Sequence, residues 1–213
     1  MIWYIRLSER LCQYIKKNCK RVVITMSIFL VLVYLPSCLF PEKFVAKINM
    51  KKDGTYSITY DGILVSMSYI ARNVGSGPFF EALISKARQI EGQMLSNPNF
   101  KKVENVGNGR YKVLYKDEGK LGSSVDFLNE VVSIKRTGKD RVEIRAMKIE
   151  REDSKKLENL NMKIDGELRI TTNARVVKHN AKSEPWLWGL IGAYTWEIKS
   201  VNDPAPYMVV QLR

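Results

Sequence analysis

The feature that most constrains this chain is an uncharged run of nineteen residues, Val22–Phe40, near its N-terminus. The continuous apolar part of the run, Val22–Leu35, has fourteen residues, because Pro36 and Pro41 bracket its end. A helix of that length rises about 21 Å, which is short of the roughly 30 Å hydrocarbon core of a bilayer. It does match the apolar length of about 7–15 residues that is typical of a signal peptide. The run therefore predicts an export signal, and we expect residues 1–38 to take no part in the folded domain.

The charges beside this run predict its orientation. The basic residues all precede it, and Glu9 is the only acidic residue on that side. The basic residues are Arg6, Arg10, Lys16, Lys17, Lys20 and Arg21. The positive-inside rule keeps such an N-terminus in the cytoplasm and sends the rest of the chain across the membrane. Counted through Phe40, the run is just long enough to span, so an uncleaved anchor is an alternative to a cleaved signal. Both alternatives place residues 39–213 outside the cytoplasm.

Leu35-Pro36-Ser37-Cys38 resembles the lipobox of bacterial lipoproteins, with Leu three residues before the cysteine and a small residue directly before it. Pro36 departs from that pattern, which usually has Ala, Ser or Thr there. The resemblance implies that Cys38 becomes the first residue of the mature protein and carries acyl chains such as palmitate, which anchor it stably. Leu39, in place of an Asp, implies the periplasmic face of the outer membrane in the bacterial cell envelope. The alternative location is a single-pass anchor in the inner membrane.

Composition limits the chemistry of the exported part. After Cys38 the chain has 29 basic and 21 acidic residues, a net charge of +8, and no cysteine. Its stability must therefore come from burial and hydrogen bonds rather than disulfides. A single histidine, His179, excludes a His-rich zinc site, and we expect no metal and no cofactor. The positive charge favours anionic envelope polymers or lipids as partners, and export argues against nucleic acid.

The pattern of the first half predicts a hairpin and one helix. Residues 44–50 and 55–60 alternate in polarity on either side of Asp53-Gly54, as two paired strands do. Asp61-Gly62 predicts a second turn, and residues 63–69 fit either a strand or a helix. Apolar residues at spacings of three and four then predict an amphipathic helix over 78–95, which Asn97-Pro98 ends.

The second half predicts mainly strands. Further hairpins are predicted at Asn108-Gly109, Thr137–Asp140 and Asp165-Gly166, with strands over 194–198 and 208–212. Residues 150–159 fit a short exposed helix or a loop. The fold class is α+β: a mostly antiparallel β-sheet with one amphipathic helix packed on it, after the N-terminal signal or anchor helix. The domain boundaries are 1–38 for the signal or anchor and 39–213 for the exported domain.

Three of the four tryptophans lie in the uncharged segment Trp186–Trp196. Trp196 alternates with apolar neighbours as a core strand does, and we interpret it as structural. Trp186 and Trp188 follow Pro185 and precede two glycines, so they are the candidates for ligand or membrane binding, because tryptophan combines a large apolar body with a polar tip. His179 is interpreted as a surface or hydrogen-bonded residue, and no catalytic residue is predicted.

Three stretches, Ile164–Ala174, His179–Ala181 and Tyr194–Ile198, resemble small uncharacterised bacterial lipoproteins in which a strand-rich domain follows a lipobox. The resemblance implies an α+β domain on a lipid anchor, and it supplies no catalytic residue. The leading hypothesis is a membrane-anchored envelope lipoprotein that acts as a non-enzymatic binding or interaction module. The alternatives are a carrier of lipids or small ligands, with an apolar cavity beside Trp186 or Trp188, and an envelope hydrolase that uses carboxylates.

Overall fold

The computed structural model describes residues 39–67, 69–70, 78–127, 131–159, 162–186 and 192–212. The predicted signal or anchor, including Cys38, lies outside the described residues. The strands are β1 (Leu39–Met50), β2 (Thr55–Ser66), β3 (Phe100–Gly107), β4 (Arg110–Lys120), β5 (Ser124–Phe127), β6 (Val132–Arg136), β7 (Arg141–Ala146), β8 (Asp165–Thr172), β9 (Arg175–His179), β10 (Tyr194–Ile198) and β11 (Tyr207–Gln211), and the helices are α3 (Pro78–Ser96) and α4 (Arg151–Asn159). In this part of the chain no helix is long and apolar enough to cross a membrane.

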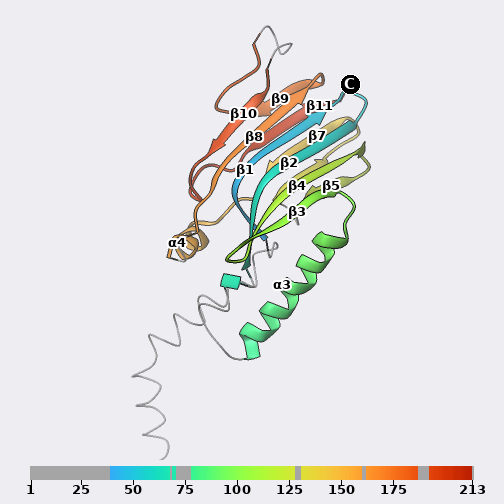
Figure 1. Cartoon of the computed structure of the whole chain (residues 1–213). Helices are drawn as coiled ribbons and strands as arrows, with labels where there is room; N and C mark the ends of the chain where they lie inside the picture. The colour runs from blue at the N-terminus through green and yellow to red at the C-terminus, as the bar shows by residue number, and fades with distance from the viewer. Residues whose placement is uncertain are drawn as a thin grey trace, which may run out of the picture. The chain divides into compact units, whose positions relative to one another are not determined.

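The described strands form two sheets (Figure 1). Sheet A has six strands in the order β10-β8-β1-β2-β4-β3, and sheet B has five in the order β5-β6-β7-β11-β9. The pairings are antiparallel except for β1 with β8, which run parallel. The α+β class is therefore confirmed, but the predicted single sheet is two.

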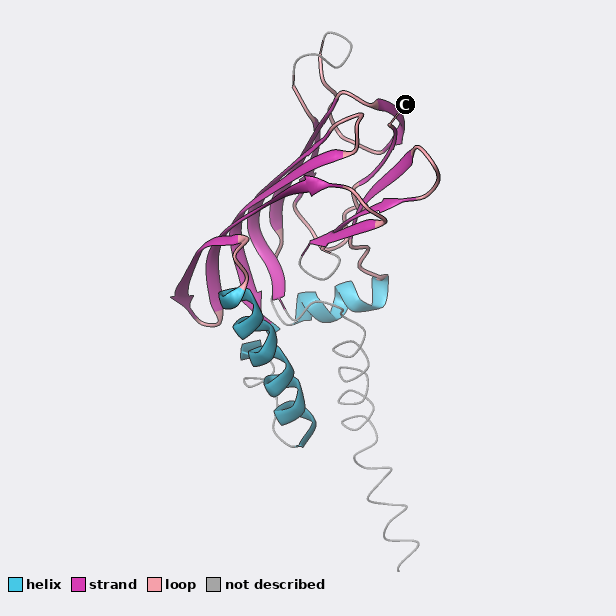
Figure 2. Cartoon of the chain, turned by 90° about the vertical axis from the view of Figure 1, so that its right-hand side faces the viewer, coloured by secondary structure: helices cyan, strands magenta, loops and turns pink. Residues whose placement is uncertain are grey.

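Sheet B, rather than a helix, packs against the inner face of sheet A, and the core lies between them (Figure 2). On β1 the buried residues Ala46, Ile48 and Met50 alternate with exposed polar ones. Tyr60, at the middle of this core, has no exposed surface, and its ring lies 5.3 Å from that of Phe127 in sheet B. Two sheets form because period-two alternation gives the central strands one apolar face, and the apolar face of a sheet must pack against another layer.

The sandwich has two ends, which we name by what lies there. At the Leu39 end, β1 and β8 begin and β2 and β10 finish. At the hairpin end, the turn Lys51–Gly54 connects β1 to β2, and Leu121 N–H donates to the Gly54 carbonyl at 2.8 Å. In Figure 1 both helices lie toward the Leu39 end, and the C-terminus lies toward the hairpin end.

Both helices match predicted segments. α3 ends at Ser96, directly before Asn97-Pro98, and its Met94 is 3% exposed in the common core. The charged stretch after Glu150 is a helix, α4, that buries Ser154 and Leu157. The amphipathic pattern therefore predicted the position of α3 in the sequence. The predicted packing of one helix on the sheet differs from the structure, because sheet B covers the inner face of sheet A.

Two predicted turns are wrong. Asp61-Gly62 lies inside β2 and Asp165-Gly166 begins β8, and each glycine pairs with Phe44 of β1. A Cβ atom added to Gly62 or Gly166 would lie within 2.6 Å of Phe44 atoms, so these glycines admit the neighbouring strand and its ring rather than a turn. The turns at Asp53-Gly54 and Asn108-Gly109 are confirmed, and Asn108 and Gly109 have positive φ values of 52° and 69°.

Candidate functional site

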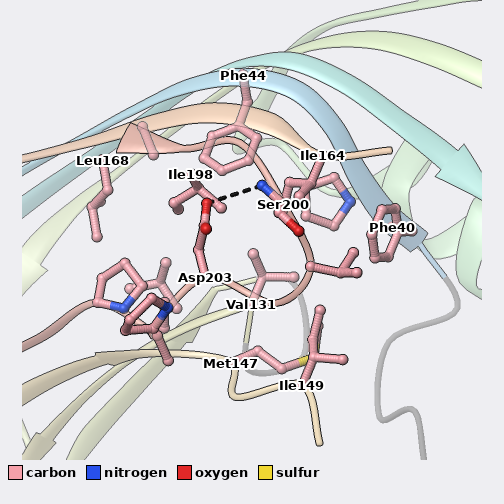
Figure 3. Close-up of a pocket in the computed structure, with 18 of the residues that line it drawn as sticks. Phe40, Phe44, Val131, Met147, Ile149, Ile164, Leu168, Ile198, Ser200 and Asp203 are labelled. Atoms are coloured by element: carbon pink, nitrogen blue, oxygen red, sulfur yellow. Dashed lines mark hydrogen bonds between the residues drawn. The ribbon is translucent and has the colours of Figure 1, made fainter. Parts of the chain in front are cut away.

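An apolar cavity of about 50 Å³ opens between the two sheets at the Leu39 end (Figure 3). Its walls come from the ends of strands in both sheets. They include Phe40, Phe44, Ile164, Leu168 and Ile198 on the sheet A side and Val131, Val132, Ala146, Met147 and Ile149 on the sheet B side. The cavity is far smaller than the roughly 300–1,000 Å³ of a pocket that encloses a whole ligand. It has room for a small apolar group, such as the end of a hydrocarbon chain.

The segment between β10 and β11 forms the polar part of the cavity mouth. The Asp203 carboxylate accepts hydrogen bonds from the backbone N–H groups of Lys199 at 2.7 Å and Ser200 at 2.9 Å. Figure 3 shows the hydrogen bond between the Asp203 carboxylate and Ser200, and the rings of Phe44 and Phe40 that line the same cavity. Pro204 and Pro206 line the cavity as well and restrict the backbone there. The polar part of the cavity lining is therefore a tight turn, and the hydrogen bonds to Asp203 fix its conformation.

An open groove of about 630 Å³ adjoins the cavity and shares Ile164, Ser200 and Val201 with it. Three lysines line this groove: Lys43, Lys163 and Lys199. An apolar cavity beside a groove with cationic side chains is suited to an amphipathic molecule that has an apolar end and an anionic group.

The acidic side chains of the groove are already engaged. Glu42 accepts two hydrogen bonds from the Arg110 guanidinium, at 2.8 and 3.0 Å, and Glu158 accepts one from Asn202. Asp165 lies 2.6 Å from the Lys199 ammonium, whose hydrogen bond and charge hold the pKa of this carboxyl below its ordinary value. Within the described residues, the ammonium group of Lys163 makes no hydrogen bond or ion pair, so it can receive an added anion.

Trp186 lies in the loop between β9 and β10, and its side chain is 77% exposed. This loop leads into Tyr194, which pairs with Ile170 near the end of β8, so Trp186 lies toward the hairpin end. It does not line the apolar cavity, where Tyr60 is the one tyrosine among the described lining residues. Trp186 and the apolar cavity therefore lie toward opposite ends of the sandwich, and the predicted site residues Trp188 and Cys38 lie outside the described residues.

His179 has local partners. Its Nδ1 accepts a hydrogen bond from the Ala181 N–H at 3.1 Å, its Nε2 lies 3.6 Å from a Glu184 oxygen, and its ring packs edge-on against Tyr194 at 4.8 Å. These contacts connect β9 to the following loop. No group of three or more His, Cys, Asp or Glu side chains that could hold a metal ion exists in the described ranges.

A polar recess of about 390 Å³ lies where α3 meets sheet A. The Glu91 carboxylate on α3 accepts hydrogen bonds from the Ser66 hydroxyl and from the Tyr111 hydroxyl, the latter at 3.2 Å. Burial and the Glu91 charge raise the pKa of Tyr111. Since these bonds join a helix to two strands, we assign Glu91 a structural role.

Sequence reasoning missed this cavity and the lysines of the adjoining groove. Phe40, Lys43, Ile164 and Lys199 come from three separate segments, which only the parallel pairing of β1 with β8 and the antiparallel pairing of β8 with β10 bring together. The glycines that pair with Phe44 were a usable signal, but each follows an aspartate and was interpreted as a turn.

No protein-family model matches this chain, and no curated protein matches it. Among solved structures, the chain is similar to the NMR structure of the folded domain of the Mycobacterium tuberculosis protein LppM. The two are 13% identical with a TM-score of 0.37, over 82% of this chain and 90% of that one. A likeness of this size determines neither the fold nor the function of this chain.

Proposed function

We propose that this chain is a membrane-anchored, non-enzymatic lipoprotein of the bacterial cell envelope whose exported domain binds a lipid at its Leu39 end. The observation that carries the proposal is that the apolar cavity lies at the end of the sandwich that holds Leu39, the residue that follows Cys38 in the sequence. Leu39, the next residue, begins β1 and is only 3% exposed. With no linker between an acylated Cys38 and the core, the Leu39 end lies on the bilayer.

The ligand class follows from the two adjoining spaces. The cavity of about 50 Å³ accepts the end of one acyl chain, and the groove of about 630 Å³ accepts the head group. Lys43 and Lys163 then face the negative charge of an anionic head group, which favours binding at a membrane surface. This proposed function differs from that of a carrier that encloses a whole ligand, because the domain binds only part of one lipid.

Carboxylate catalysis has little support in the described part of the chain. A general acid in a hydrolase needs a raised pKa, usually through burial or a like charge. In the described residues, hydrogen bonds and cationic neighbours lower the pKa of Asp53, Glu104, Asp165 and Glu167, which is the opposite of what a general acid needs. We therefore favour binding over hydrolysis.

The direct test compares the lipid that copurifies with the full-length protein and with Ala146→Leu. Ala146 lines the cavity and is partly buried, so a leucine there fills the space that the acyl chain needs. The matched control is Ala174→Leu, which is also partly buried but lies outside the cavity. We expect bound lipid in the wild type and control and its loss in Ala146→Leu. Equal lipid in all three, or none in the wild type, would contradict the proposal.

A second pair of variants keeps the core intact. Lys43→Ser with Lys163→Ser removes two of the three groove lysines and leaves Lys199, which pairs with Asp165, whereas Lys47→Ser with Lys116→Ser removes two exposed cations from the outer face of sheet A. We expect only the first pair to lose the preference for anionic over zwitterionic lipids. Intact mass of Cys38→Ala separately tests the anchor, since the added acyl mass should disappear.

A further inference from the structure

The positive charge of the exported part is concentrated at the hairpin end. We define the hairpin-end rim as residues 51–54, 120–124, 135–141, 172–175 and 211–212. It contains eight basic and two acidic residues, a net charge of +6, whereas all residues after Cys38 together carry +8. Its basic residues are Lys51, Lys52, Lys120, Lys135, Arg136, Lys139, Arg141 and Arg175. Most of the excess charge therefore lies at the end opposite the apolar cavity.

Backbone contacts make the rim continuous across both sheets. The N–H of Lys52 donates to the Asn173 side chain at 2.8 Å, and that of Leu121 donates to Gly54. The Arg136 guanidinium donates to the carbonyls of Leu121 and Gly122, at 3.2 Å each, so it is structural. The turns of sheet A and sheet B therefore present their other basic side chains on one surface.

Lys135 lies 3.8 Å from Asp126, whereas several of the other basic side chains are exposed. Lys120, Lys139, Arg141 and Arg175 are exposed. Arg141 and Arg175 pair with Gln211 from opposite sides, so two strand spacings, about 10 Å, separate them. Phosphate sites usually gather several donors around one anion. Cations this far apart suit separate, singly charged carboxylates.

Trp186 adds an aromatic surface toward the same end. Its side chain is 77% exposed, whereas Trp196 is 4% exposed in the core. An exposed indole presents a flat apolar face on which a sugar ring can stack. We propose that the hairpin-end rim, with Trp186, binds a carboxylate-bearing glycan of the envelope. This inference is independent of the lipid site, and together the two sites would let the domain connect a membrane with an acidic polymer.

The test measures binding of the full-length protein in detergent to alginate, a glycan of carboxylated sugars, with neutral dextran and polyphosphate as comparisons. The rim variant is Lys120→Thr with Arg141→Thr and Arg175→Thr. The matched control is Lys47→Thr with Lys112→Thr and Lys116→Thr, which removes three exposed cations from the outer face of sheet A. Both carry the same change in net charge, and threonine suits strands.

We expect the rim variant to bind alginate about tenfold more weakly and the control to bind as the wild type does, because exposed charge pairs each contribute modestly. Binding should also weaken as salt rises. Equal losses of alginate binding in the rim variant and the control would mean that only net charge matters, and would overturn the proposal. Alginate binding by the wild type that is no stronger than its dextran binding would also overturn it. Tighter binding to polyphosphate than to alginate would overturn the carboxylate assignment. Unchanged alginate binding by Trp186→Ala would remove that residue from the site.

Discussion

Phe44 is the residue on which the cavity wall most depends. It pairs with Gly62 on one side and Gly166 on the other, and its ring stacks on Tyr60 with centroids 5.4 Å apart. Gly166 leaves room for the Phe44 ring, and Gly62 leaves room for the backbone and Cβ of Phe44, so a side chain at either position would displace Phe44. The position of this aromatic wall is therefore fixed from both sides.

Gly166→Ala should destabilise the domain by about 1–3 kcal/mol, because the new methyl group would lie 2.3 Å from Phe44 ring atoms and must displace them. Urea unfolding followed by circular dichroism measures the change. The control is Gly122→Ala, since an added Cβ there has no neighbour within 4 Å. A Gly166→Ala protein as stable as the control would show that Phe44 is free to move.

The ionisation of Tyr56 predicts how the stability of the fold depends on pH. Burial, and then the nearby Asp117 carboxylate that accepts its hydroxyl at 3.2 Å, raises the pKa of Tyr56 to about 12. Because the folded state favours the neutral phenol, this group stabilises the fold below about pH 10, and the contribution is lost as the pH rises toward 12. In a phenolate absorbance titration, Asp117→Asn should lower the pKa of Tyr56 yet leave it above 10, since burial is the larger cause. An unchanged titration would contradict the role of Asp117.

At the scale of elements, α3 is joined to sheet A by few contacts in the described residues. Glu91 accepts hydroxyl hydrogen bonds from both Ser66 and Tyr111, and Met94 is buried in the core. Leu95, by contrast, is 65% exposed. Among the described side chains near the C-terminal end of α3, Glu91 and Met94 therefore hold the helix to the sheet.

Glu91→Ala should speed amide hydrogen exchange in the last turns of α3 by about tenfold or more, because hydrogen bonds to a charged group contribute about 1.5–3 kcal/mol. Exchange in β1 and β2 should not change. Glu81→Ala, an exposed position in the first turn of the same helix, is the control with the same charge change. Equal exchange in both variants would mean that Glu91 does not hold the helix.

The elements also show what the sequence could predict. Turns whose residues need positive φ, such as Asn108-Gly109, were identified because that requirement is local. Asp61-Gly62 and Asp165-Gly166 carry the same dipeptide as the confirmed turn at Asp53-Gly54, but their glycines pair with Phe44, and that contact is set by the pairing of distant strands. The second sheet was missed for a related reason: alternation shows that one face of a strand is buried, but not by which partner.

At the scale of the whole exported domain, the two ends differ in chemistry. The Leu39 end holds the apolar cavity, and the hairpin-end rim holds most of the net positive charge. β1 spans the distance between them, and its twelve residues correspond to about 36 Å. Neither end was visible in the sequence, because each gathers residues from segments far apart in the chain.

The central claim, that the Leu39 end takes up a lipid acyl chain from the bilayer, is tested most directly by photocrosslinking. The full-length protein is placed in vesicles that contain a phospholipid with a photoreactive group at the end of one acyl chain, and the adducts are mapped by peptide mass spectrometry. We predict adducts in residues 39–46 and 146–149, which line the cavity, and their loss in Ala146→Leu. Adducts confined to the segment around Trp186, or none within residues 39–213, would contradict the account.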